Sequence, residues 1–303
     1  MAHRFGMVIV VILLIGGILA VQGTIGFSEE SRSLAAHRNY SHVKIHRTPQ
    51  KLVLRSASVL VEDQQTGECL VQKHAEAVLP IASITKLMTA MLVLDAKMNL
   101  QESLTIVPED VDTLRHSRSR LPVGSRITRG DALLLALMAS ENRAAHALGR
   151  TYPGGLAAFV SAMNVKAQSL GLAETHFEDP SGISSGNVSS ARDLTRMVAA
   201  AYRYHLIREF TTRKEATIYT GHRTREFRNS NRLIRSPRWQ IGLSKTGFID
   251  EAGRCLVMQA HVANRAVLIV LLDSQGKLTR YGDANRIKKW MEGPLAERRK
   301  YSS

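Results

Sequence analysis

Residues 80–96 read PIASITKLMTAMLVLDA and combine two polar side chains, Ser83 and Lys86, with a long apolar run. From Ile84 to Ala96 the run is apolar on nearly every side, which predicts a helix that is buried all round. Residues three apart share one face of a helix, so we expect the Ser83 hydroxyl and the Lys86 ammonium to lie within reach of each other. Ser-x-x-Lys also occurs at Ser41 and Ser274, but only Ser83 opens a long apolar run.

Two further motifs follow in order along the chain. Ser140-Glu141-Asn142 comes directly after the apolar helix predicted over Ala132–Met138, which Thr128-Arg129-Gly130-Asp131 opens as a capping box. Lys245-Thr246-Gly247 begins at the end of a short strand-like segment, Ile241–Lys245. Each motif alone has a purely structural explanation, as a helix cap or as a charged residue on an edge strand. The three in this order favour a catalytic site.

These residue types suit a serine acyl-transferase that has no catalytic histidine. The Ser83 hydroxyl needs a base, and Lys86 can be that base only if burial and a nearby cation such as Lys245 lower its pKa from about 10.4. We expect Ser140 to relay a proton to the leaving amine, and Asn142 to hold the substrate carbonyl or Lys86 in place.

The remaining site predictions concern substrate binding. Thr246 can bind a carboxylate, and Gly247 allows substrate backbone to lie against the strand edge as an added strand. The backbone amides of Ser83 and Phe248 are expected to form an oxyanion hole. Arg254 can either reach a substrate carboxylate or lie solvated at the surface.

Length and composition limit the classes of protein to which this chain can belong. The chain has 303 residues, of which 44% are hydrophobic and 22% charged, so it can bury a core in one or two domains. The stretch from Phe5 to Ser28 carries no charge, which predicts an export signal over residues 1–23, either cleaved or retained as an anchor. Residues 24–51 are polar and basic and read as a tether. We therefore expect the folded part to lie in the periplasm.

The expected partners and cofactors follow from the same data. The formal charge of +15 favours anionic wall polymer or lipid over nucleic acid in an exported protein. No cofactor or metal is predicted, since His42 and His46 lie in a segment without helical periodicity and no His-Glu-x-x-His occurs. Arginines in the segment from His222 to Arg238 either face such an anionic partner or form a solvated surface. We expect a monomer.

The order of predicted elements gives the fold class. A hairpin is predicted over Leu52–Val71, two more strands over Arg254–His261 and Ala266–Leu272, and helices between about 84 and 212. This pattern predicts an α+β fold with one antiparallel sheet, completed from both ends of the chain, and an inserted helical subdomain. The catalytic domain is expected over residues 52–292, with a last helix over Thr279–Glu292 and a polar tail over 293–303. The cleft between sheet and insert is the expected site.

The three motifs resemble those of the serine-type penicillin-binding proteins and β-lactamases, over about Leu52–Trp290. Within that superfamily the chain most resembles the low-molecular-mass D-alanyl-D-alanine endopeptidases, in residues 80–90, 140–145, 187–194 and 245–248. The resemblance implies the β-lactamase/transpeptidase-like fold with a five-stranded sheet, Ser83 as nucleophile and Lys86 as general base. It also implies hydrolysis of D-alanyl to diaminopimelyl cross-links between peptidoglycan stem peptides, with β-lactams as covalent inhibitors.

Three alternatives share these residues: a D,D-carboxypeptidase, a penicillin sensor or scaffold that does not turn over, and a β-lactamase. Residues 178–182 read EDPSG and lack the asparagine of the Glu-x-x-x-Asn loop of class A β-lactamases, which disfavours the last alternative. The short tail after the last helix disfavours the carboxypeptidase relatives, which usually continue into a β-rich second domain.

The two cysteines are expected to remain unpaired. Spacing alone does not pair Cys69 with Cys255. In the strand order that the resemblance implies, their strands are three places apart, or about 14 Å at the usual strand spacing. That distance is too long for a disulfide.

Overall fold

The computed structural model describes residues 52–300, with side chains as far as Gly293. The predicted signal and tether, residues 1–51, and the histidines at 42 and 46 lie outside the described residues. Within the described part, no helix has the length and apolar character needed to cross a membrane. No group of three or more His, Cys, Asp and Glu residues in that part could hold a metal ion.

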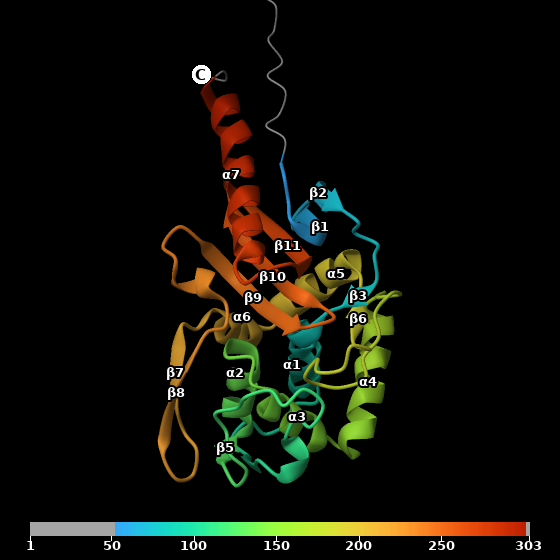
Figure 1. Cartoon of the computed structure of the whole chain (residues 1–303), viewed down its shortest axis with the longest axis vertical. Coiled ribbons are helices and arrows are strands. Elements are labelled where there is room, and N and C mark those ends of the chain that lie inside the picture. The colour runs from blue at the N-terminus through green and yellow to red at the C-terminus, as the bar shows by residue number, and fades with distance from the viewer. Residues whose placement is uncertain (1–51, 301–303) are drawn as a thin grey trace, which may run out of the picture. The chain divides into compact units, whose positions relative to one another are not determined.

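Five antiparallel strands form the central sheet, in the order β2-β1-β11-β10-β9 (Figure 1). Ser58 of β1 lies opposite Leu272 of β11, so strands from both ends of the domain meet in the middle of the sheet. This arrangement confirms the predicted sheet. The strands are β1 (Ser56–Asp63), β2 (Cys69–Lys73), β9 (Gln240–Ile249), β10 (Gly253–Val262) and β11 (Arg265–Ser274).

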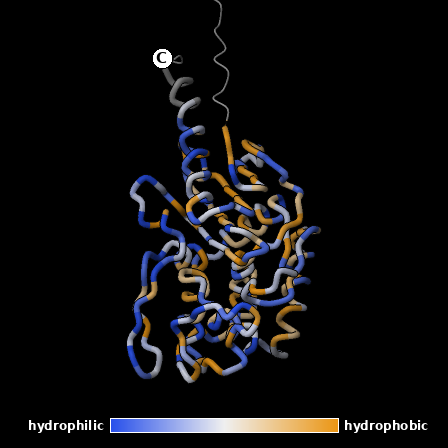
Figure 2. The backbone as a smooth tube through the Cα atoms, viewed as in Figure 1, coloured by the Kyte–Doolittle hydropathy of each residue, from blue (hydrophilic) through white to orange (hydrophobic). Residues whose placement is uncertain are grey.

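Both faces of the sheet are buried. Successive side chains of a strand point to opposite faces, so neighbouring residues enter two different cores. Val257 of β10 lies in the core shared with the inserted helices, whereas its neighbours Leu256 and Met258 lie in the core shared with α7 (Thr279–Lys300). In Figure 2 the coloured part of α7 is largely hydrophilic, so a few side chains such as Ile287 make its buried face.

Six helices make up the insert, which lies between Lys86 and Thr212. Helix α1 is buried from Lys86 to Val93 and packs against all five of the others, which confirms the predicted buried helix. Thr128 caps α2 by accepting a hydrogen bond from the amide of Asp131 at 3.0 Å. The helices are α1 (Lys86–Asp95), α2 (Arg129–Met138), α3 (Asn142–Arg150), α4 (Gly155–Ser169), α5 (Ala191–Tyr202) and α6 (His205–Thr212).

Short elements connect these layers. Three small antiparallel pairs are β3 (Leu79–Pro80) with β6 (Val188–Ser189), β4 (Ser103–Thr105) with β5 (Arg126–Thr128), and β7 (Glu215–Tyr219) with β8 (Thr224–Arg228). Three 3₁₀ turns are η1 (Ala82–Thr85), η2 (Pro108–Asp110) and η3 (Arg232–Arg235). The basic segment from His222 to Arg238 therefore contains a strand and a turn, neither of which was predicted.

Three predicted boundaries were wrong. Ser83 lies in η1, before α1 begins at Lys86. Strand β9 continues past Lys245 to Ile249, because Gly247 stays in the ladder opposite Cys255. Helix α7 continues past Glu292 to Lys300 and includes Pro294. A proline removes one backbone hydrogen bond from a helix but does not always end it.

Both cysteines are free, as predicted. Cys69 lies on β2 and Cys255 on β10, with β1 and β11 between their strands. Cys69 is exposed and Cys255 is buried.

Candidate active site

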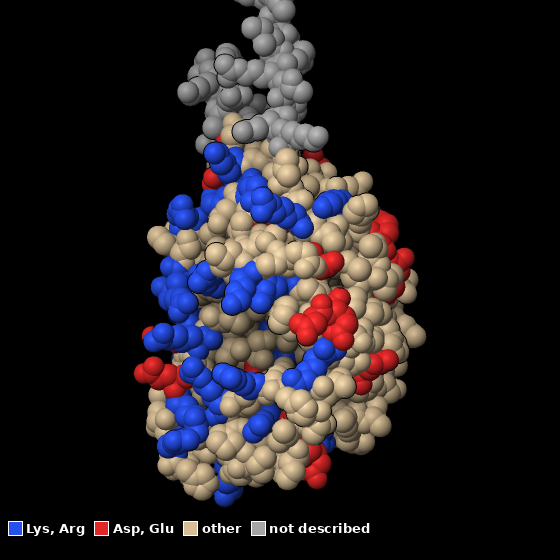
Figure 3. Space-filling model, in the orientation of Figure 1, with Lys and Arg blue, Asp and Glu red and all other residues tan. Residues whose placement is uncertain are grey.

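The three motifs meet where the sheet borders the inserted helices. Lys245-Thr246-Gly247 lies on β9, one of the two edge strands of the sheet. Strand β9 packs against η1, which carries Ser83. Ser140 lies on the turn between α2 and α3. Figure 3 shows a hollow in this region, bordered by lysine and arginine side chains and, on its right, by acidic side chains.

A cavity of about 360 Å³ opens beside Ser83. Its walls come from the start of α3, from the loop over residues 182–183 and from the end of β9, where Phe248 is 48% exposed. The cavity thus lies between the sheet and the insert, where the sequence predicted a cleft.

The Lys86 side chain lies at the centre of the site and is completely buried. Its Nζ atom donates to Ser83 Oγ at 2.8 Å, to Asn142 Oδ1 at 2.7 Å and to the backbone carbonyl oxygen of Ser181 at 2.5 Å. The Asn142 amide in turn donates from Nδ2 to Ser117 Oγ at 2.8 Å. The structure therefore brings Ser83, Lys86 and Asn142 together as predicted.

Burial is the main cause of the unusual acidity of Lys86, and lowers its pKa to about 7. The carboxylates of Asp179, Glu141 and Asp112 act in the opposite direction. The pKa of Lys245 also lies well below its ordinary value, first because of burial and then because of the charges of Lys86 and Arg280. The predicted lowering of the Lys86 pKa is thus due mainly to burial, and the nearby cation that was also expected to lower it, Lys245, is not among its main causes.

This shift should make the stability of the protein depend on pH. Between pH 7 and 10.5 the unfolded chain holds a proton on Lys86 that the folded chain has lost, so the free energy of unfolding should rise with pH. One such proton contributes at most about 1.4 kcal/mol per pH unit. Urea unfolding at pH 7 and pH 9 should therefore show a larger rise for the wild type than for Lys86→Met. An equal rise in both proteins would contradict the lowered pKa of Lys86.

Lys245 and Ser140 form a second polar pair in the site. Lys245 Nζ donates to Ser140 Oγ at 2.7 Å and to the carbonyl oxygen of Thr246 at 3.0 Å. Ser140 has a φ of 61°, a left-handed conformation that costs about 1–2 kcal/mol outside glycine. Such strain clusters at functional sites. The Thr246 hydroxyl contacts Ser230 Oγ at 2.7 Å.

Gly247 allows β9 to approach η1 closely. A Cβ atom at this position would lie 2.8 Å from the carbonyl oxygen of Ile81 and 3.2 Å from the amide nitrogen of Ser83. The glycine is thus needed for packing against the turn that carries Ser83, in addition to the predicted room for substrate. The Arg254 guanidinium lies over the ring of Phe248, 4.1 Å from the centroid, and so lies beside a residue that lines the cavity at Ser83.

The loop that supplies the Ser181 carbonyl was not predicted from the sequence. Asp179 Oδ1 accepts hydrogen bonds from the amides of Ser181 and Gly182 at 2.6 and 2.8 Å. Asn187, which is fully buried, accepts from the amide of Asp179 and donates to its carbonyl oxygen and to Thr85 Oγ1. The loop is therefore tied to η1. A signal was present in the Asp-Pro-Ser-Gly turn and in Asn187, but it specified no role.

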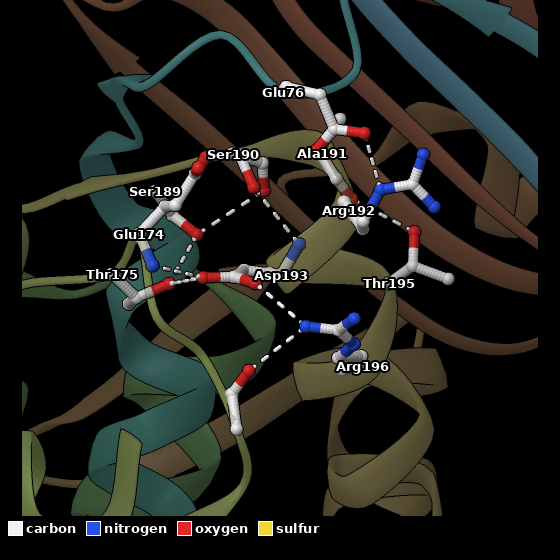
Figure 4. Close-up of polar contacts among 11 residues, drawn as sticks. Glu76, Glu174, Thr175, Ser189, Ser190, Ala191, Arg192, Asp193, Thr195 and Arg196 are labelled. Atoms are coloured by element: carbon white, nitrogen blue, oxygen red, sulfur yellow. Dashed lines mark hydrogen bonds and ion pairs between the residues drawn. The ribbon is translucent and has the colours of Figure 1, made fainter. Parts of the chain in front are cut away.

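The chain beyond this loop is anchored at the start of α5. Ser190 caps the helix by accepting from the amide of Asp193 at 3.1 Å. The buried carboxylate of Asp193 accepts from the amide of Glu174 at 2.8 Å and from the Thr175 hydroxyl at 3.0 Å (Figure 4). These contacts connect the segments before and after the loop, so they hold both of its ends.

Comparison with known proteins gives consistent matches. Residues 45–276 match the family described as D-alanyl-D-alanine carboxypeptidase. The D-alanyl-D-alanine endopeptidase of Pseudomonas aeruginosa is 49% identical over 246 residues, which span 80% of this chain and 79% of that protein. The D-alanyl-D-alanine endopeptidase of Escherichia coli is 45% identical over 241 residues, which span 79% and 78%. The solved DD-transpeptidase of Streptomyces K15 aligns with a TM-score of 0.74 and 29% identity over 80% of this chain and 98% of that one.

Proposed function

Because the chain belongs to the D-alanyl-D-alanine carboxypeptidase family of serine peptidases, we propose that it is a D,D-endopeptidase acting through an acyl-enzyme on Ser83. Its substrate would be the D-alanyl to diaminopimelyl cross-link of peptidoglycan. The observation that carries this proposal is the position of the buried Lys86 amine, which contacts Ser83 Oγ and two carbonyl oxygens. The endopeptidase names of the similar Pseudomonas and Escherichia proteins support the choice of bond.

The two carbonyl oxygens orient the base. A neutral lysine amine has two N–H groups and one lone pair, and a carbonyl oxygen can only accept a hydrogen bond. Asn142 Oδ1 and the Ser181 carbonyl therefore take both N–H groups. The lone pair of the neutral amine is left to face Ser83 Oγ. The hydrogen bond that the protonated Lys86 donates to Ser83 therefore reverses, and Ser83 donates its proton. Asn142 Nδ2 donates to Ser117, and the oxygen of the amide accepts from Lys86.

Acylation follows from this geometry. Ser83 Oγ attacks the D-alanyl carbonyl carbon as its proton passes to Lys86. The amides of Ser83 and Phe248 stabilise the oxyanion. The C–N bond then breaks, and the amine of the neighbouring stem peptide takes its proton from Ser140, which regains one from Lys86. Water, deprotonated by Lys86, hydrolyses the ester and restores Ser83.

Lys245 prepares Ser140 for the relay. Lys245 Nζ donates to Ser140 Oγ, so the hydroxyl proton of Ser140 can point to the leaving amine. Thr246 would bind the carboxylate next to the scissile bond, and substrate backbone would add to the free edge of β9 at Gly247.

The cellular setting is part of the proposal. The similar proteins are bacterial, and we place this chain in the periplasm, exported by residues 1–23. Its partners would be peptidoglycan stem peptides, with β-lactams as covalent inhibitors. Peripheral contact with wall or membrane and a monomeric state remain predictions, as do the tether at 24–51 and the boundaries of the domain.

Fluorescent penicillin tests the role of Ser83. The wild type should become labelled and Ser83→Ala should not, because the ester cannot form without the hydroxyl. Equal labelling of both proteins would remove Ser83 from the mechanism. Rapid loss of the label from the wild type would indicate a β-lactamase, and a label that persists without any turnover of muropeptides would indicate a sensor.

Purified cross-linked muropeptide dimers test the choice of bond. The endopeptidase should convert dimers to monomers. A D,D-carboxypeptidase is the second candidate, because the family description names that activity. It would release terminal D-alanine and leave the dimer intact.

A further inference from the structure

A second cavity, of about 790 Å³, lies next to Ser140. It is lined by Ala139 and Glu141, the residues on either side of Ser140, by Glu226 and by three arginines: Arg118, Arg120 and Arg228. Its volume is about twice that of the 360 Å³ cavity beside Ser83. No residue lines both cavities.

The position of this cavity relates it to the leaving group. In the proposed mechanism Ser140 gives its proton to the leaving amine, so the chain attached to that amine departs past Ser140. The amide of Ser230 donates to the carbonyl oxygen of Met138 at 2.9 Å, which holds the end of β8 against the turn that carries Ser140. Arg228 at that end thus lies beside Ala139 and contributes to the same wall.

The arginines leave donors available to an anionic ligand. Arg118 makes no hydrogen bond or ion pair with the described residues, and Arg120 uses one nitrogen on the carbonyl oxygen of Glu226. Arg228 lies 4.0 Å from Glu215, and both side chains are exposed, so this pair is weak. Two acidic residues also line the cavity: Glu141, whose carboxylate caps α3, and Glu226. The three arginines therefore leave the lining with one net positive charge. Figure 3 shows lysine and arginine gathered along this side of the hollow, over β7 and β8.

We propose that this cavity binds the leaving stem peptide through carboxylates that lie beyond the scissile bond. This inference rests on the proposed function and extends it to substrate choice. A departing D-alanine carries one carboxylate, next to its amine. A departing stem peptide carries that group and further carboxylates along its length. Guanidinium groups at the cavity wall can pair with these additional carboxylates, so they favour cross-linked peptides over terminal D-alanine.

The test replaces two lining arginines and varies the substrate in parallel. The variant is Arg118→Gln/Arg228→Gln in the full chain. The matched control is Arg223→Gln/Arg238→Gln, which removes the same charge from two exposed arginines that do not line the cavity. Four readouts are compared: penicillin acylation, D-alanine release from a pentapeptide, cleavage of a muropeptide dimer, and cleavage of the same dimer with the leaving-strand carboxylates amidated.

We expect kcat/KM for the dimer to fall at least about tenfold in the lining variant, mainly through KM, because two charge-assisted contacts are lost. Acylation and D-alanine release should stay within about twofold of the wild type. The control should match the wild type throughout. Amidation should slow the wild type about as much as the double substitution does, and should have little further effect on the variant.

Dimer cleavage at the wild-type rate by the lining variant would overturn the inference. So would a parallel loss of penicillin acylation, which would mean that the arginines support the whole site. If the wild type acylates and releases D-alanine but leaves dimers intact, the proposed bond is wrong and the inference fails with it. If the wild type does not acylate at all, the proposed mechanism itself fails.

Discussion

Lys86→Met should slow the acylation of Ser83 by about 10²–10⁴-fold, the usual contribution of a positioned general base. Methionine has a similar length and no charge, so it suits a side chain that is completely buried. The fold should therefore survive the change. In the wild type the acylation rate should rise with pH through about 7, as Lys86 loses its proton. Stopped-flow labelling with fluorescent penicillin measures both effects, and the rate of the variant should lack this rise.

The matched control is Lys289→Met, which makes the same chemical change at an exposed lysine on α7. It should acylate at the wild-type rate and keep the same pH profile. A wild-type rate in Lys86→Met would show that another group removes the Ser83 proton. A loss of rate accompanied by unfolding would be recognised from the circular dichroism spectrum and the thermal midpoint, measured on the same samples.

The sheet was predictable because its signal is local. Successive side chains of a strand alternate between the two faces of the sheet, which determines the core that each residue enters. In β10, Val257 enters one core, and Leu256 and Met258 enter the other. The buried helix α1 was predictable for the same reason. The strand order came from the resemblance to known families, since alternation alone does not state which strands are neighbours.

The contact between Ser83 and Lys86 was predicted correctly although Ser83 lies in η1 and not in α1. Residues three apart also share a face in a 3₁₀ turn, where they nearly eclipse each other. Spacing therefore brings the two side chains together in either kind of helix. The prediction did not depend on where the α-helix begins.

The third partner of Lys86 could not be predicted from the sequence. It is the backbone carbonyl of Ser181, which lies 95 residues further along the chain. Every residue has a carbonyl group, so no pattern of side chains marks the one that will face the amine. Asp179 and Asn187 position it through hydrogen bonds that only the folded loop reveals. The cavity beside Ser140 could not be predicted either. Its arginines come from segments about 110 residues apart in sequence, and nothing in the sequence shows that these segments meet in the fold.

Gly182→Ala should destabilise the protein strongly. Gly182 has a φ of +78°, and a Cβ atom there would lie 2.0 Å from the carbonyl oxygen of Ala82, which is backbone and cannot easily move away. Left-handed conformation and overpacking together predict a loss of about 2–5 kcal/mol in the free energy of unfolding. Acylation should also slow, because the added methyl group separates the Ser181 carbonyl from the turn that carries Ser83. Urea unfolding and penicillin labelling measure the two effects.

Gly171→Ala is the matched control, because Gly171 has the left-handed backbone conformation of Gly182 but not its close contact. Gly171 has a φ of +67°, but a Cβ atom there would meet nothing within 4 Å. The control should therefore lose only about 1–2 kcal/mol from the left-handed conformation, with no change in acylation. Equal losses in both variants would show that strain alone requires glycine at 182. A larger loss at 182, together with slower acylation, would show that the loop must contact η1 for Lys86 to keep both of its carbonyl partners.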